Sequence, residues 1–174
     1  MLKSKFKNKK IFIAGTGGMV GGAICKKFQQ EGFCHLLTPK RSELDLSKSL
    51  LVSKWFKEKK PDVVILAAAK VGGILDNAKH PADFLLENLK IQNNVIEAAW
   101  KNNVERFIFL GSSCIYPKFA NQPIKEEYLL EGKLEPTNDS YAIAKISGIK
   151  LCQALNNQYE FDAISLMPTN LYGP

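Results

Sequence analysis

The sequence predicts an α/β domain built on a doubly wound parallel sheet. Three observations predict it. Short apolar strand patterns alternate with segments of helical period, a glycine-rich turn joins the first strand to the first helix, and the third strand, Asp62–Ala67, has an unbroken apolar run from Val63 onward. Such alternation produces parallel strands joined by right-handed crossovers, with helices on both faces of the sheet. Strands covered on both faces are apolar throughout.

The first third of the chain predicts two strands and two helices. Lys10–Ala14 indicates a buried strand, and Met19–Gln30 indicates a helix because its apolar residues recur at helical spacing. His35–Thr38 indicates a short second strand, followed by an amphipathic helix over Ser47–Lys59. In that helix we expect the core-facing residues to be Leu50, Leu51, Trp55 and Phe56.

The rest of the chain repeats the pattern after Asp62–Ala67. A glycine-containing loop precedes a long helix over Pro81–Asn102, and Arg106–Leu110 forms the fourth strand. A proline-rich loop leads to a helix over Tyr141–Gln158 and a fifth strand over Ala163–Met167. The length of 174 residues fits one domain, 1–174. Because the chain ends directly after a strand, we interpret it as truncated.

Composition excludes several classes of protein. Hydrophobic residues make up 45% and charged residues 24%, which excludes a disordered chain. The longest apolar run, Val63–Ala69, is far shorter than a membrane span, so we expect no membrane contact. The net charge of +7 suits an anionic small molecule, and the lysine-rich start, Met1–Lys10, is interpreted as solvated rather than as a nucleic-acid arm, because no aromatic platform accompanies it.

The four cysteines show neither a Cys-x-x-Cys pair nor the spacing of metal ligands, so no metal site is expected; they are Cys25, Cys34, Cys114 and Cys152. Free thiols in a reducing cytoplasm are the simplest account, with three of the four as packing residues.

A glycine-rich loop follows the first predicted strand, with glycines at Gly15, Gly18 and Gly21. Such a loop between strand and helix is typical of Rossmann-like dinucleotide sites. Its glycines allow a tight turn, backbone approach to a pyrophosphate, and close packing of helix on strand, while the helix N-terminus attracts the phosphate. A sharp turn without ligand is the alternative. The predicted cofactor-binding residues are Gly15, Thr16, Gly17, Gly18, Met19, Val20 and Gly21.

The end of the second predicted strand carries Lys40-Arg41, where an NAD site expects an acid. A guanidinium can hold a 2′-phosphate through two hydrogen bonds, whereas a carboxylate would repel it. The sequence therefore favours NADP(H), although Glu43 and Asp45 lie close by.

Tyr141 and Lys145 stand four residues apart in a predicted helix and share one face. We expect the lysine ammonium, together with the positive ring of an oxidised nicotinamide cofactor, to lower the tyrosine pKa, so that the phenol can exchange a proton with a carbonyl or alcohol oxygen. An exposed helix face is the alternative. Ser112, at the end of the fourth strand, can hydrogen-bond the same oxygen.

Together these features resemble the extended short-chain dehydrogenase/reductase superfamily. Within it, the chain is similar to the GDP-L-fucose synthase family, whose members are NADPH-dependent 3,5-epimerase/4-reductases acting on GDP-4-keto-6-deoxy-D-mannose. The similarity rests on five segments: Leu66-Ala-Ala-Ala-Lys-Val-Gly-Gly73, Leu110-Gly-Ser-Ser-Cys-Ile-Tyr-Pro117, Glu135-Pro-Thr-Asn138, Tyr141-Ala-Ile-Ala-Lys145 and Met167-Pro-Thr-Asn-Leu-Tyr-Gly-Pro174.

The resemblance implies a role for each matching residue. Tyr141 would protonate the C4 oxygen, Lys145 would hold the nicotinamide ribose, Ser112 would orient the keto group, and Cys114 would be an acid/base for epimerisation. It also implies a GDP-sugar substrate, a homodimer, and a cofactor site that includes Arg41, Asp45, Leu46, Leu110, Gly111, Ser113, Lys145, Pro168, Thr169, Asn170 and Leu171.

The chain departs from the family pattern at three places. The family's second epimerisation residue, a histidine beyond the Tyr-Gly-Pro motif, has no match, since the two histidines are His35 and His80. The C-terminal substrate domain is missing, and Thr16 and Gly17 stand where a basic residue sometimes lies. We therefore expect NADPH binding, without turnover of the keto sugar by this chain alone.

Two alternatives stay open. One is a nucleotide-sugar 4,6-dehydratase or 4-epimerase of the same superfamily, which usually has an acid after the second strand and lacks a cysteine two residues after the serine. The other is a non-catalytic nucleotide-binding module.

Overall fold

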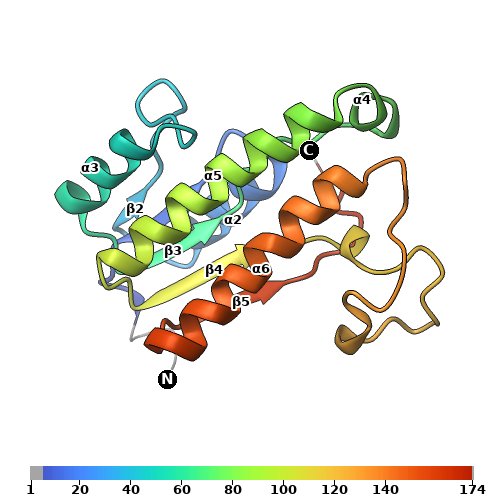
Figure 1. Ribbon diagram of the computed structural model, residues 1–174. Coiled ribbons are helices and arrows are strands. Elements are labelled where there is room, and N and C mark those ends of the chain that lie inside the picture. The colour runs from blue at the N-terminus through green and yellow to red at the C-terminus, as the bar shows by residue number, and fades with distance from the viewer. Residues whose placement is uncertain (1–5, 174) are drawn as a thin grey trace.

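The computed structural model describes residues 6–173, and within them five parallel strands form one sheet in the order β2-β1-β3-β4-β5 (Figure 1). Part of the predicted solvated start, Met1–Lys10, and the final Pro174 lie outside the described residues. Each strand falls within its predicted range, which confirms the parallel α/β architecture. The strands are β1 (Ile11–Ala14), β2 (Leu36–Leu37), β3 (Val63–Leu66), β4 (Arg106–Leu110) and β5 (Ala163–Leu166).

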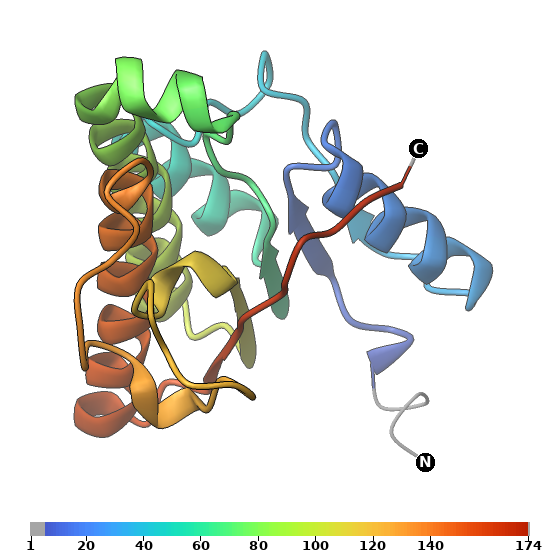
Figure 2. The ribbon, with the colours of Figure 1, turned by 90° about the vertical axis from the view of Figure 1, so that its right-hand side faces the viewer.

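The helices lie on both faces of the sheet, but unevenly. Figure 2 shows α3, α5 and α6 on one face and α2 on the other. The winding direction explains this, because a right-handed crossover places its helix on the face set by the direction of travel. Across the sheet, the crossover from β1 to β2 runs in one direction, and every later crossover runs in the opposite direction. The helices are α2 (Met19–Gln30), α3 (Ser49–Lys59), α4 (Ile74–Lys79), α5 (Pro81–Lys101) and α6 (Asp139–Tyr159), with short 3-10 turns η1 (Ser113–Ile115) and η2 (Glu126–Tyr128).

The core is densest between the sheet and the three-helix layer. Every residue of β1 and β3 is buried, which confirms the expectation for strands covered on both faces. Phe12 contacts Trp55 at 4.5 Å between ring centroids, and Phe56 completes this aromatic cluster. At the edge of the sheet, Ile164 and Leu166 of β5 are exposed.

The predicted inward face of α3 is partly wrong. Leu50 is 84% exposed and Leu51 is 50% exposed, whereas Val52 and Phe56 are fully buried. The stripe that contacts the core is Val52, Trp55 and Phe56, with i, i+3, i+4 spacing, and Leu50 lies roughly 200° around the helix from Val52.

Among the cysteines, Cys152 is buried, Cys25 and Cys114 are half-buried, and Cys34 is exposed. None of the helices in the described part of the chain has the length and apolarity needed to cross a membrane. Residues 6–173 contain no cluster of three or more side chains suited to hold a metal ion.

Candidate active site

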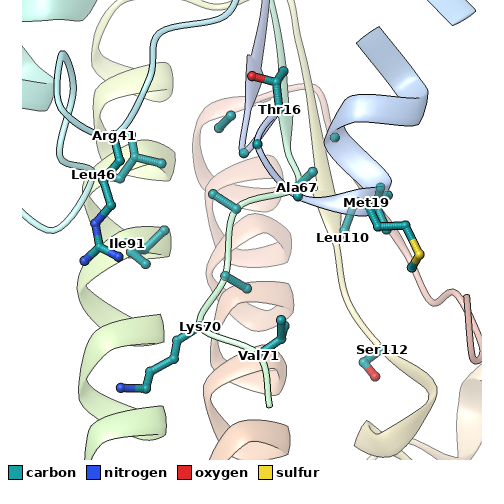
Figure 3. A pocket seen from close by; sticks show the side chains of 18 of the residues that line it. Thr16, Met19, Arg41, Leu46, Ala67, Lys70, Val71, Ile91, Leu110 and Ser112 are labelled. Carbon is teal, nitrogen blue, oxygen red and sulfur yellow. The ribbon is translucent and has the colours of Figure 1, made fainter. Parts of the chain in front are cut away.

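A cavity of about 1360 Å³ opens at the carboxyl ends of the strands (Figure 3). It lies beside β1, which pairs with β2 on one side and with β3 on the other, so that the crossovers on the two sides of β1 run in opposite directions. This reversal of strand order is where ligands bind in doubly wound sheets. The cavity is lined by all of the predicted site residues except Ser113 and Cys114, namely Gly15, Thr16, Gly17, Gly18, Met19, Val20, Gly21, Arg41, Asp45, Leu46, Leu110, Gly111, Ser112, Tyr141, Lys145, Pro168, Thr169, Asn170 and Leu171.

Two glycines of the loop are required by close backbone approach. Gly15 has φ +94°, and a Cβ there would lie 2.7 Å from the backbone nitrogen of Ala68. A Cβ on Gly21 would overlap the carbonyl oxygen of Gly15 and lie 2.6 Å from its carbonyl carbon. By contrast, a Cβ on Gly17 would meet nothing within 4 Å. The loop is thus packed against β3 and α2 while one of its sides stays open.

The start of α2 is suited to an anion. Its N-cap, Gly18, supplies no side-chain cap, and the first turn contains no acidic residue. The first N–H groups of a helix have no partner within the helix, and they carry its partial positive charge. Because Gly18 and the loop line the cavity, these groups lie at its wall. A phosphate fits this place.

The two acids after β2 are engaged in local turns. Glu43 Oε2 accepts a hydrogen bond from the backbone nitrogen of Lys40 at 2.8 Å. Asp45 Oδ1 accepts from Ser47 Oγ at 2.7 Å and from Ser47 N at 3.0 Å, and these hydrogen bonds lower the pKa of Asp45. Arg41 has a side chain that is 78% exposed, so its guanidinium is available to a ligand.

Ser112 and Cys114 form a contact pair at the end of β4. The Cys114 thiol donates to Ser112 Oγ at 3.1 Å, and the Cys114 backbone nitrogen lies 3.4 Å from the same oxygen. Burial raises the pKa of Cys114, against the lowering effects of the Ser112 hydrogen bond and of Lys145. Cys114 is therefore a neutral thiol at pH 7. Ser113 does not reach the cavity lining, and its backbone nitrogen donates to the Pro168 carbonyl oxygen at 3.1 Å.

Tyr141 and Lys145 share the face of α6 that lines the cavity, as predicted, and in the chain by itself the pKa of Tyr141 is raised rather than lowered. Burial raises the pKa of Tyr141 to about 12, with a smaller contribution from Cys114. Lys145 is 4% exposed, and burial lowers its pKa to about 8. Its ammonium donates to the Leu110 carbonyl oxygen at 2.7 Å and lies 5.8 Å from the centroid of the Tyr141 ring. Without a ligand, burial of the phenol therefore raises the pKa of Tyr141 more than the Lys145 ammonium lowers it.

Packing against α5 and β4 places this face of α6. Gln92, buried in α5, donates to the Ala144 carbonyl oxygen at 2.7 Å and to Ser147 Oγ at 3.1 Å. A Cβ on Gly148 would lie 2.5 Å from the Phe109 ring, so this glycine lets α6 approach β4 closely. The same ring lies under Lys145, 5.0 Å from its Nζ to the centroid.

Part of the cavity wall was missed by the sequence-based interpretation. The segment 67–72 after β3 and two residues of α5, Glu87 and Ile91, also line the cavity. The segment was detectable, because it follows the carboxyl end of a predicted central strand. Glu87 and Ile91 gave no such signal, because the distance of α5 from the second strand depends on tertiary packing.

The burial of Lys145 predicts a pH-dependent effect of Lys145→Met on stability. The amine has a lower pKa in the folded chain than in the unfolded chain, so the unfolded state binds more protons between about pH 8 and pH 10.5. The Lys145 contribution to the free energy of unfolding is therefore unfavourable below about pH 8 and vanishes above about pH 10.5.

We expect the stability of Lys145→Met, relative to the unmodified chain, to fall by about 3 kcal/mol from pH 7 to pH 11. Urea unfolding of both proteins across this range measures it. Taking the difference between them removes the opposite contribution of the buried Cys152 thiol, whose pKa is raised by burial alone. A difference that stays constant with pH would contradict the prediction.

Comparison with known proteins agrees with this geometry. Residues 11–174 match the model of the NAD dependent epimerase/dehydratase family. GDP-L-fucose synthase 1 of Arabidopsis thaliana is 58% identical over 97% of this chain and 52% of its own length. The GDP-L-fucose synthase of Escherichia coli is 54% identical over 95% of this chain and 52% of its own length.

Among solved structures, a GDP-D-glycero-L-gluco-heptose synthase from Campylobacter jejuni, studied in the presence of NADPH, superposes with a TM-score of 0.93 and 45% identity over 96% of this chain and 49% of that one. The chain thus spans about half the length of the curated relatives that it matches. The family match covers nearly all of the chain. The chain belongs to the NAD-dependent epimerase/dehydratase family.

Proposed function

We propose that this chain is the NADP(H)-binding, reducing part of an enzyme of the GDP-L-fucose synthase type, which converts GDP-4-keto-6-deoxy-D-mannose to GDP-L-fucose. The observation that carries the proposal is the convergence of Ser112, Tyr141 and Lys145 on one cavity with the glycine loop. Similarity to curated GDP-L-fucose synthases over nearly the whole chain supports the substrate class. A homodimer and a cytoplasmic location are part of the proposal.

The cavity fits NADP(H). The loop is open at Gly17, the start of α2 offers N–H groups to the pyrophosphate, and Arg41 offers its guanidinium to the 2′-phosphate. Leu46 and Ile91 supply apolar wall nearby. When bound, NADPH supplies the hydride that reduces the C4 carbonyl.

The reduction needs a proton at the C4 oxygen. Tyr141 is a neutral phenol at pH 7, because its pKa is about 12, and can therefore donate that proton. Ser112 Oγ accepts from Cys114, so its hydroxyl hydrogen can be directed to the same oxygen and stabilise developing negative charge. The Lys145 ammonium, held by the Leu110 carbonyl, stabilises the phenolate that remains.

Epimerisation uses a different proton transfer. A carbon next to a ketone loses its proton when the enolate oxygen is stabilised, and inversion requires an acid on the opposite face from the base. Cys114 does not itself line the cavity, but it is a neutral thiol in contact with Ser112, which does, and its bound proton suits the role of the acid. The matching base is not supplied by a histidine near the cavity, because His35 and His80 do not line it. Of the two steps, reduction is the one whose proposed acid, Tyr141, lines the cavity.

Calorimetric titration with NADPH and NADH tests the cofactor assignment. A charge-assisted pair between Arg41 and the 2′-phosphate is worth roughly 1.5–3 kcal/mol, so we expect NADPH to bind at least about tenfold more tightly than NADH. Arg41→Ala should remove most of this preference while leaving NADH binding unchanged. Tighter binding of NADH by the unmodified chain would overturn the assignment and favour a sister 4-epimerase or 4,6-dehydratase.

A further inference from the structure

A carboxylate on the cavity wall links two cations that come from different segments. Glu87, in α5, accepts from Arg41 Nη2 at 3.2 Å through Oε1 and from Lys70 Nζ at 3.3 Å through Oε2. All three residues line the cavity. Figure 3 shows Arg41 extending from the segment after β2 and Lys70 from the segment after β3, both toward α5. The three side chains form what we call the Glu87 bridge.

The Lys70 end of this bridge is held rigidly. Asn88, which is 2% exposed, accepts from the Lys70 backbone nitrogen at 2.9 Å and donates to the Lys70 carbonyl oxygen at 3.0 Å. Lys70 Nζ also lies over the Phe84 ring, 5.4 Å from its centroid. Glu87 itself is 29% exposed. Glu87 therefore precedes a residue, Asn88, that joins α5 to the segment after β3 through two hydrogen bonds.

The Arg41 end of the bridge is exposed and is held by Glu87. Arg41 belongs to the irregular segment between β2 and α3, its side chain is 78% exposed, and within residues 6–173 Glu87 is its one ion-pair partner. A guanidinium has five N–H donors, and the contact with Glu87 uses those of Nη2, so the others remain for a second oxyanion. The glycine loop adds no cation between Gly15 and Gly22.

We propose that Glu87 is a positioning residue for recognition of the 2′-phosphate of NADP(H): it orients Arg41 so that the unused donors face the cavity. With Lys70 on its other oxygen, the bridge keeps a net positive charge, so that a carboxylate next to the site does not cancel the attraction for phosphate. The inference rests on the proposed binding of NADP(H). It makes α5, as well as the segment after β2, a determinant of cofactor choice.

Calorimetric titration of Glu87→Gln with NADPH and NADH tests the inference. An exposed ion pair contributes about 0.2–1 kcal/mol, so we expect NADPH to bind about 1.5-fold to fivefold more weakly and NADH to bind with unchanged affinity. In an Arg41→Ala background, Glu87→Gln should no longer weaken NADPH binding. A general loss of structure would lower both affinities and would persist in that background.

Glu97→Gln is the matched control, because it removes the same charge from the same helix at an exposed position whose partner is Lys101. It should leave both affinities unchanged. Unchanged or tighter NADPH binding by Glu87→Gln would overturn the inference, since Glu87 would then be neutral or a competitor of the phosphate. Failure of the proposed function is distinct: the unmodified chain would then bind neither nucleotide, or would prefer NADH.

Discussion

Replacing Gly21 by alanine is expected to destabilise the chain by about 3 kcal/mol and to weaken NADPH binding about a hundredfold. The added Cβ would overlap the Gly15 carbonyl oxygen and lie 3.0 Å from the Thr16 nitrogen. These neighbours are backbone atoms, so the clash is relieved only if the loop moves away from α2. Because the loop supplies N–H groups to the pyrophosphate, losing two such charge-assisted hydrogen bonds accounts for the drop in affinity.

Gly17→Ala is the matched control for this change, because it adds the same methyl group to the same loop where nothing lies within 4 Å. Its unfolding free energy should stay within about 0.5 kcal/mol of the unmodified chain. Urea unfolding and calorimetric titration with NADPH measure both variants. Equal stability of Gly21→Ala and Gly17→Ala would show that the loop does not pack on α2 as described.

Most of the sheet could be predicted from the sequence, because apolar strands between amphipathic helices have a pattern of their own. All five strands lie inside their predicted ranges. Helix α4 was not predicted: its six residues are too few to show a period, and Asn77 stabilises it by donating to the carbonyl oxygens of Gly72 and Gly73. The inward face of α3 was partly wrong because Leu50 and Leu51 are apolar yet lie outside the stripe that contacts the core.

The candidate site was predictable where a motif marks it, and not where tertiary packing creates it. The glycine loop and the Tyr141–Lys145 pair lie together as expected. Glu87 lies 46 positions from Arg41 in sequence, so their contact depends on the placement of α5 beside the end of β2. The direction of the Tyr141 pKa shift likewise depends on burial, which spacing alone does not report.

Replacing Tyr141 by phenylalanine is expected to lower the rate of keto-sugar reduction by about a thousandfold, since removal of a positioned general acid costs roughly a hundredfold to ten-thousandfold. The assay follows NADPH consumption by a chimera in which this chain is continued with the C-terminal half of the Escherichia coli GDP-L-fucose synthase, its relative at 54% identity. Phenylalanine keeps the ring that lies next to Lys145 and removes only the hydroxyl. The affinity for NADPH should therefore change by less than about threefold, because the glycine loop and Arg41 are untouched.

Tyr128→Phe serves as the control, because Tyr128 lies in η2 and does not line the cavity. It should reduce the keto sugar at the rate of the unmodified chimera. A Tyr141→Phe chimera of equal activity would place the proton donor elsewhere, whereas an unmodified chimera that binds NADPH without consuming it would favour a nucleotide-binding module over an enzyme. Because the phenol is desolvated, with a pKa of about 12, it stays protonated across neutral pH. The rate ratio between the two variants should accordingly stay constant from about pH 6 to pH 8, because any other titrating group is present in both; a ratio that varied with pH there would show that Tyr141 itself titrates in this range.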